Sequence, residues 1–250
     1  MNYCVRIAYN GADYSGWQRQ KNAVSLQQTI EEALTKLIQE PIQIIGCGRT
    51  DAGVHALSYY FNFKTAKDLP EHILFKLNAM CPHDIAFFDL WEVPREFHAR
   101  FEAKERSYKY FLHTSKNPFQ QGLSLLYSHK LDLDKMNEAC KLIIGKHDFT
   151  SFAKTHTEVN NFYCTIEKAQ WTLNGESQIV FEVTANRFLR NMVRALVGTL
   201  LEVGIGRKDV SFINEVLSAK DRSAAGQSMP GHALYLSQIK YDQNLWQKRT

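Results

Sequence analysis

The sequence has few cysteines, and nothing in their spacing pairs them. There are five, an odd number, with no CxxC pair and no Cys/His cluster of zinc-ligand spacing. This pattern argues against a disulfide framework and against a structural zinc site. We expect reduced thiols and no metal.

Long apolar runs are also missing. The N-terminal stretch from Met1 to Gly11 has no apolar core of the signal-peptide kind. The most apolar late stretch, Ala195 to Val203, is short and contains Glu202. We therefore expect neither export nor a membrane span, and a cytoplasmic location.

Positively charged residues are in only slight excess, with a net charge of +4 and a pI near 8.7. Such a balance is compatible with a polyanionic partner, but it is common in proteins that bind none. The sequence has no low-complexity linker and no short repeat. With 250 residues, 44% of them hydrophobic, it can form one large core or two modest ones.

The first hundred residues predict the element order βαββαβ. Tyr3 to Tyr9 has the pattern of a strand, and Ser25 begins a helix that continues through Glu40. Ser25 and Gln28 form a capping-box pattern ahead of apolar residues at helical spacing. The remaining elements are strands at 42–47 and 57–63, a helix beginning at Pro70 and a strand at 85–93.

The same order is predicted again from Arg106. A strand to His113 is followed by a helix at 133–144, strands at 165–173 and 179–185, a helix at 188–203 and a strand at 234–241, with an extra helix near 210–217. We therefore expect an α+β fold of two ferredoxin-like βαββαβ halves, residues 1–103 and 104–250. Each half would have an antiparallel sheet, leaving a broad sheet surface between the halves.

The segment with the clearest chemical pattern is Gly46 to Ala56, GCGRTDAGVHA. Its three glycines permit a tight loop, from which Arg49 and Asp51 present opposite charges. An ionised and positioned carboxylate can be a nucleophile at a sugar carbon, a base, or a stabiliser of developing positive charge. Alternatively, Asp51 only caps the turn and Arg49 is its surface ion-pair partner.

The pattern Gly-Arg-Thr-Asp-Ala-Gly-Val-His, unbroken from Gly48 to His55, resembles the signature of the bacterial tRNA pseudouridine synthase A family. The resemblance covers almost the whole chain. Its other motifs are YNGADYSGWQRQ at 9–20, FHARF at 97–101, RSYKY at 106–110, DFTSF at 148–152 and NRFLRNMVR at 186–194.

This resemblance implies an isomerase that needs neither metal nor organic cofactor and that modifies uridines 38, 39 and 40 of tRNA. Asp51 would be the catalytic nucleophile, Arg49 would pair with it and occupy the space of the extruded nucleotide, and Tyr108 would stack on the target base. The two halves would then flank a central RNA-binding cleft. The resemblance also implies a homodimer.

Alternation along its strand places Tyr108 and Tyr110 on one face, and we expect Tyr110 in the core and Tyr108 in the site. Three arginines, at spacings of three and four, are expected along one face of the helix that follows Ala185, where phosphates would bind: Arg187, Arg190 and Arg194. The alternative is a solvated basic face.

Trp17, Gln18 and Arg19 resemble a family element near the RNA surface, with Arg19 as an RNA contact. A buried Trp17 that anchors the first turn is the other interpretation.

The sequence departs from the family pattern at Asn10, at Ser58 and Tyr59, and at Cys164, where Asp, Gly-Gln and Arg are common. These departures leave two further hypotheses open besides the tRNA enzyme: the same chemistry on another RNA, or an RNA-binding factor without activity. A nucleoside-cleaving hydrolase would also use a carboxylate at C1′, but it would release free uracil.

Overall fold

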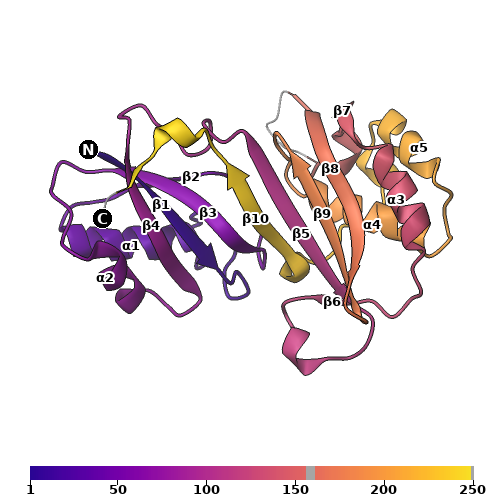
Figure 1. Ribbon diagram of the computed structural model, residues 1–250, viewed down its shortest axis with the longest axis horizontal. Coiled ribbons are helices and arrows are strands. Elements are labelled where there is room, and N and C mark those ends of the chain that lie inside the picture. The colour runs from indigo at the N-terminus through magenta and orange to yellow at the C-terminus, as the bar shows by residue number, and fades with distance from the viewer. Residues whose placement is uncertain (156–160, 249–250) are drawn as a thin grey trace. The chain divides into compact units, whose positions relative to one another are not determined.

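The computed structural model describes residues 1–155 and 161–248. Its contacts divide the chain into two compact units, Met1–Lys104 with Leu236–Thr250, and Glu105–Tyr235. The fold is α+β, with a mixed sheet and five α-helices among the described residues (Figure 1). No helix in those residues is long and apolar enough to cross a membrane.

The first unit has a sheet in which β1 (Asn2–Tyr9) lies between β3 (His55–Lys64) and β4 (Ile85–Val93), antiparallel to both. β2 (Ile44–Gly46) pairs with β3, and β11 (Gln247–Lys248) pairs with β4. Because β1 is paired on both sides, it has no free edge and its backbone hydrogen-bonding groups face strand partners.

Helix α1 (Leu26–Ile38) begins where its sequence predicts. The Ser25 hydroxyl accepts a hydrogen bond from the Gln28 backbone N–H at 3.3 Å, which satisfies one of the free donors of the first turn. The Gln28 amide does not return the capping-box bond; it donates to Glu32 one turn later. The apolar face of the helix is buried at Leu26, Ile30, Leu34 and Ile38.

Helix α2 (Ile73–Met80) begins three residues after Pro70, so the predicted start is wrong. His72 has φ 52°, in the left-handed region, and a helix cannot continue through it. Ile73 and Leu77 are buried, and α2 packs against β4 and α1.

The C-terminal segment belongs to the first unit, whereas the sequence placed it in the second half. Lys104 N–H donates to the Lys240 carbonyl at 2.8 Å, and the Tyr241 hydroxyl donates to the Ala99 carbonyl at 2.6 Å. β10 (Leu234–Lys240) therefore begins in the second unit and continues in the first.

The second unit has a sheet in the order β5 (Glu105–His113), β9 (Gln178–Ala185), β8 (Tyr163–Asn174) and β7 (Gly145–Asp148), with neighbours antiparallel. The two-residue strand β6 (Leu125–Leu126) pairs in parallel with β5. β6 and β7 were not predicted, because such short strands leave no periodic pattern.

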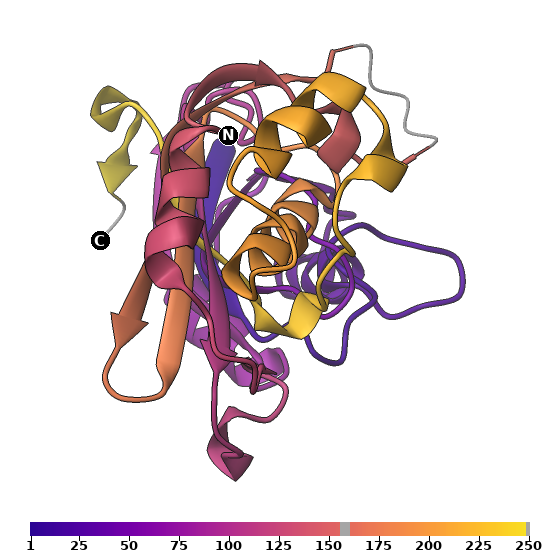
Figure 2. The same cartoon turned by 90° about the vertical axis from the view of Figure 1, so that its right-hand side faces the viewer.

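Three helices pack in this unit: α3 (Leu133–Lys141), α4 (Met192–Gly204) and α5 (Phe212–Ala219). Helix α4 is buried over nearly its whole length, with α3 and α5 packed on it. In Figure 2 the orange helices α4 and α5 lie on one side of the unit's strands.

The predicted start of α4 at Phe188 is wrong, because the helix begins at Met192. Asn191 has φ 68°, and its amide donates to the Ser228 hydroxyl at 2.6 Å. Asn186 is also held in place, since its carboxamide oxygen accepts from the Thr165 N–H at 2.9 Å. Residues 186–191 are therefore a fixed connection rather than a first helical turn.

Candidate functional site

The loop between β2 and β3 carries the two charged residues of the signature motif. Asp51 is half-buried and Arg49 is exposed, while Thr50 between them is buried. The Val54 N–H donates to the Asp51 carbonyl at 3.2 Å, and Gly53 has φ 74°, so residues 51–54 form a tight turn. This turn determines the direction in which the Asp51 side chain projects from the backbone.

Arg49 makes no ion pair within residues 1–155 and 161–248. The geometry therefore supports neither a surface ion pair with Asp51 nor the pairing of the two residues that the resemblance implies. Its exposed guanidinium is accessible to a ligand in solution. Within the described parts of the chain, no group of three His, Cys, Asp or Glu side chains is arranged to hold a metal ion.

The segment 10–17 lies directly against this loop. The Trp17 N–H donates to the Thr50 carbonyl at 3.1 Å, and the Gly53 N–H donates to the Tyr14 carbonyl at 3.3 Å. At the start of the segment, the Gly11 N–H donates to His55 Nδ1 at 3.0 Å, which makes His55 a buried structural residue. Two of the recognised motifs thus form one hydrogen-bonded structure.

Two glycines make this approach possible. Gly16 has φ 98°, and a Cβ on it would lie 2.5 Å from the Thr50 carbonyl oxygen. A Cβ on Gly11 would lie 2.1 Å from the Val54 carbonyl oxygen. Both positions therefore require glycine for the two backbones to touch.

Trp17 is 2% exposed and stacks on Tyr59, with ring centroids 4.0 Å apart. The interpretation in which Trp17 anchors the turn is therefore confirmed. Arg19 is exposed, and its guanidinium lies 3.4 Å from a carboxylate oxygen of the buried Glu31. Glu31 also accepts from the Ile44 N–H at 3.1 Å, so Arg19 balances a charge that connects α1 to β2.

Among the departures from the family pattern, Tyr59 contacts the loop itself. It is fully buried, and its hydroxyl donates to the Gly48 carbonyl at 2.5 Å. Sequence reasoning missed this contact, because nothing local links Tyr59 on β3 to the loop that precedes it. Asn10 accepts from the Ala12 N–H at 3.1 Å, a turn bond that an aspartate would make equally well.

Tyr108 and Tyr110 lie on β5 in the second unit. Tyr110 is fully buried and donates to the Pro230 carbonyl at 3.0 Å, so its predicted place in the core is confirmed. Tyr108 is half-buried, and its ring meets Phe188 edge to face with centroids 5.2 Å apart. Ser107 and Lys109 contact Thr184 and Glu182 on the strand β9, as expected for alternation.

The three predicted phosphate-binding arginines do not share one helical face. Arg187 and Arg190 precede α4, and only Arg194 lies on the helix. Arg187 is half-buried and Arg190 is exposed, while Arg194 donates through Nε to the Met229 carbonyl. The helical stripe is therefore wrong, because the left-handed Asn191 delays the start of the helix.

A segment that sequence reasoning did not single out holds Arg194 in place. Residues 221–230 lie against α4, where the Met229 N–H donates to the Arg194 carbonyl at 3.1 Å. Arg222 stabilises this segment by donating to the Ala225 and Gly226 carbonyls and to the Ser228 hydroxyl.

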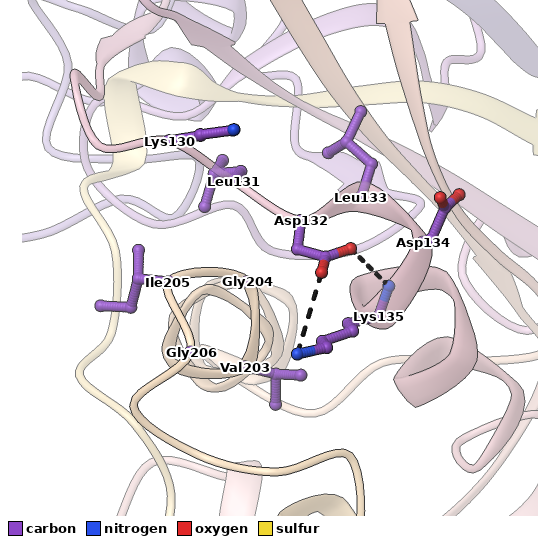
Figure 3. A pocket seen from close by; sticks show the side chains of 10 residues that line it. All are labelled: Lys130, Leu131, Asp132, Leu133, Asp134, Lys135, Val203, Gly204, Ile205 and Gly206. Carbon is purple, nitrogen blue, oxygen red and sulfur yellow. Dashed lines mark hydrogen bonds and ion pairs between the residues drawn. The ribbon is translucent and has the colours of Figure 1, made fainter.

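A separate hollow of about 520 Å³ lies in the second unit between the start of α3 and the end of α4 (Figure 3). Asp132 there accepts from the Lys135 N–H at 3.1 Å and lies 3.9 Å from the Lys135 ammonium, so its carboxylate serves as the α3 cap. None of the predicted site residues lines it, and it is not part of the candidate site.

The sequence matches the tRNA pseudouridine synthase family over residues 6–102 and 139–242. The chain belongs to this family. A tRNA pseudouridine synthase A from Parabacteroides distasonis is 46% identical over 246 residues, which cover 98% of this chain and 97% of that protein. The resemblance inferred from the motifs is confirmed.

Two further relatives carry the same name. The protein from Porphyromonas gingivalis is 44% identical over 248 residues, which are 98% of each chain. The protein from Clostridium acetobutylicum is 40% identical over 243 residues, which are 96% of this chain and 99% of that one. Both units therefore fall within the matched length.

Proposed function

We propose that this member of the tRNA pseudouridine synthase family converts uridine to pseudouridine in the anticodon stem-loop of tRNA, at nucleotides 38, 39 and 40, with Asp51 as catalytic nucleophile. The family makes the protein an isomerase acting on tRNA. The observation that carries the assignment of Asp51 is its place in a motif unbroken from Gly48 to His55, on a loop fixed by hydrogen bonds on both sides.

The reaction breaks the C1′–N1 bond of uridine and forms a C1′–C5 bond after the uracil has turned. The C5 proton leaves and N1 gains a proton, so the product is an isomer of the substrate and no oxidant or reductant is needed. In this proposal the Asp51 carboxylate attacks the nucleotide and leaves again when the new carbon–carbon bond has formed. The target nucleotide must be extruded from its stack for Asp51 to reach it.

The remaining residues have supporting roles in this proposal. Tyr108 packs on the uracil, because an aromatic face holds a base without fixing its orientation in the plane. Arg49 takes the place of the extruded nucleotide, a role that its exposed guanidinium suits. Phosphates are contacted by Arg19, Arg187, Arg190 and Arg194.

We further propose a homodimer that acts on tRNA in the cytoplasm. We also interpret each unit as a ferredoxin-like half. In the first unit the order β1, α1, β2, β3, α2, β4 agrees with the βαββαβ pattern.

The test uses anticodon stem-loop transcripts in which a single uridine, at 38, 39 or 40, carries tritium at C5. The wild-type protein should release tritium from each transcript without forming free uracil. Asp51→Asn should release none, because the amide is not a nucleophile. Asp132→Asn is the matched control, since asparagine caps a helix as well as aspartate does, and it should keep wild-type activity.

Each alternative gives a different result. Tritium release from other RNAs but not from the stem-loops would indicate the same chemistry on another substrate. Free uracil would indicate a hydrolase. Tight RNA binding without any reaction would indicate an RNA-binding factor and would contradict the proposal.

A further inference from the structure

Three aromatic side chains form a compact group under the Asp51 loop, here called the aromatic block: Tyr9, Trp17 and Tyr59. Trp17 and Tyr59 stack with centroids 4.0 Å apart, and Tyr9 lies 5.5 Å from Tyr59. All three are 4% exposed or less. Rings packed this tightly have fixed rotamers, so the block gives its polar groups defined positions.

The polar groups of the block bind the loop on both sides of Arg49. The Tyr59 hydroxyl donates to the Gly48 carbonyl at 2.5 Å, before Arg49. The Tyr9 hydroxyl lies 2.9 Å from the Thr50 hydroxyl, after Arg49. Asp51 is the next residue, so the block holds the Gly48 carbonyl and the Thr50 side chain just before the proposed nucleophile.

Tyr59 fits here because Gly46 has no side chain. A Cβ on Gly46 would lie 2.1 Å from the Tyr59 hydroxyl oxygen and 2.6 Å from Trp17 Nε1. Burial raises the pKa of the Tyr59 hydroxyl well above its usual value, so the group remains a protonated donor at neutral pH. A buried hydroxyl needs a partner, and the Gly48 carbonyl is that partner.

We propose that Tyr59 is a positioning residue for the reaction: its hydroxyl, acting with that of Tyr9, holds residues 48–50 so that the Asp51 carboxylate faces the uridine. This inference rests on the proposed function and deepens it, since it names what presents Asp51. Catalytic groups must be held within about 0.5 Å of their productive geometry by residues whose own rotamers are locked by packing, and the buried, stacked Tyr59 is packed in this way. Tyr59 stands where the family commonly has glutamine, so the family pattern does not assign this role to it.

The first test removes the hydroxyl alone. Tyr59→Phe keeps the ring and its stacking, and it should lower kcat on the anticodon stem-loop by about tenfold, the effect of roughly one hydrogen bond. KM for the stem-loop should stay within twofold, because Tyr59 does not contact RNA in this account. A general structural defect would instead lower the folded fraction and leave the kcat of the folded protein unchanged.

Tyr60→Phe is the matched control. Tyr60 follows Tyr59 on β3 and points to the other face of the sheet, where its ring lies 6.1 Å from Trp91. The variant Tyr60→Phe also loses one tyrosine hydroxyl, but the Tyr60 side chain does not hold the loop. Its kcat should equal that of the wild type.

A second measurement does not depend on activity. Amide hydrogen exchange of residues 50–54 should be at least tenfold faster in Tyr59→Phe than in the wild type, with exchange in β1 unchanged. If the wild type forms no pseudouridine, the proposed function fails, and the exchange result alone decides whether Tyr59 holds the loop. Unchanged exchange, or unchanged kcat in an active enzyme, would overturn the inference.

A double-mutant cycle tests the joint action of the two hydroxyls. If Tyr9 and Tyr59 hold one rigid backbone segment, the kcat loss in the double variant Tyr9→Phe/Tyr59→Phe should differ from the product of the single losses. A product within twofold of the double loss would show that the two hydroxyls act independently and would contradict the joint role of Tyr9.

Discussion

Replacing Gly16 with alanine should displace the Asp51 loop. Gly16 has φ 98°, which costs an alanine about 1–3 kcal/mol. The new Cβ would also lie 2.5 Å from the Thr50 carbonyl oxygen and 3.1 Å from the Asp51 carbonyl carbon. Both neighbours are backbone atoms, so the loop itself must shift, and such overpacking costs about 1–3 kcal/mol more.

Gly145→Ala is a closely matched control. Gly145 has the same φ of 98°, but the nearest atom to its Cβ would be His147 Nε2 at 3.8 Å, an ordinary van der Waals contact. It should therefore incur only the backbone cost. The difference between the two variants isolates the collision with the Asp51 loop.

The assay combines urea unfolding with kcat for pseudouridine formation. Gly145→Ala should lose about 1–3 kcal/mol of unfolding free energy and keep kcat within twofold. Gly16→Ala should lose more and show a kcat lower by about 100-fold, the effect of misplacing a catalytic group by about 1 Å. Wild-type kcat in folded Gly16→Ala, or equal kcat losses in both variants, would refute the reasoning.

Three further predictions concern buried polar groups. Asn62→Ala should lower the unfolding free energy by about 2–4 kcal/mol in urea titrations, because the buried Asn62 carboxamide bonds Asn2, the Phe97 carbonyl and the Ala99 N–H. Burial, with a smaller effect of His113, lowers the pKa of His232 below 6.5, so the unfolded chain takes up its proton first. Stability should therefore decline as pH falls from about 6.5 to the folded pKa, and His232→Gln should flatten that part of a thermal-melt series. All five cysteines are buried, so the native protein should react slowly with a thiol reagent, whereas the unfolded chain should show five fast thiols; five fast thiols without denaturant would contradict the described packing.

Elements with strong local patterns were predicted well from the sequence. The strand at 85–93 has the predicted bounds, and α1 begins after its Ser25 cap. The start of α4 was missed because its cause is distant: Asn191 is held by Ser228, 37 residues later. The C-terminal segment was misplaced for a similar reason, since its partner Ala99 is 142 residues away from Tyr241.

In the candidate site, too, the features with local causes were predicted and those with distant causes were not. The loop and its two charged residues follow from local composition, because glycines and opposite charges in a short segment are visible in the sequence. What supports the loop is not local: Tyr9 and Thr50 are 41 residues apart, and Tyr59 meets Gly48 only because β3 turns back alongside β2. The arginine stripe failed because it assumed a helix where tertiary hydrogen bonds impose a turn.

The central claim is that Asp51 converts uridines of the anticodon arm. The most direct measurement is carbodiimide-dependent primer extension on unmodified tRNA transcripts, after incubation with the wild type or with Asp51→Asn. The account predicts stops for nucleotides 38, 39 and 40 with the wild-type protein and none with the variant. Stops that persist in Asp51→Asn would contradict the role of Asp51, and an absence of stops with the wild type on any transcript would contradict the proposed reaction.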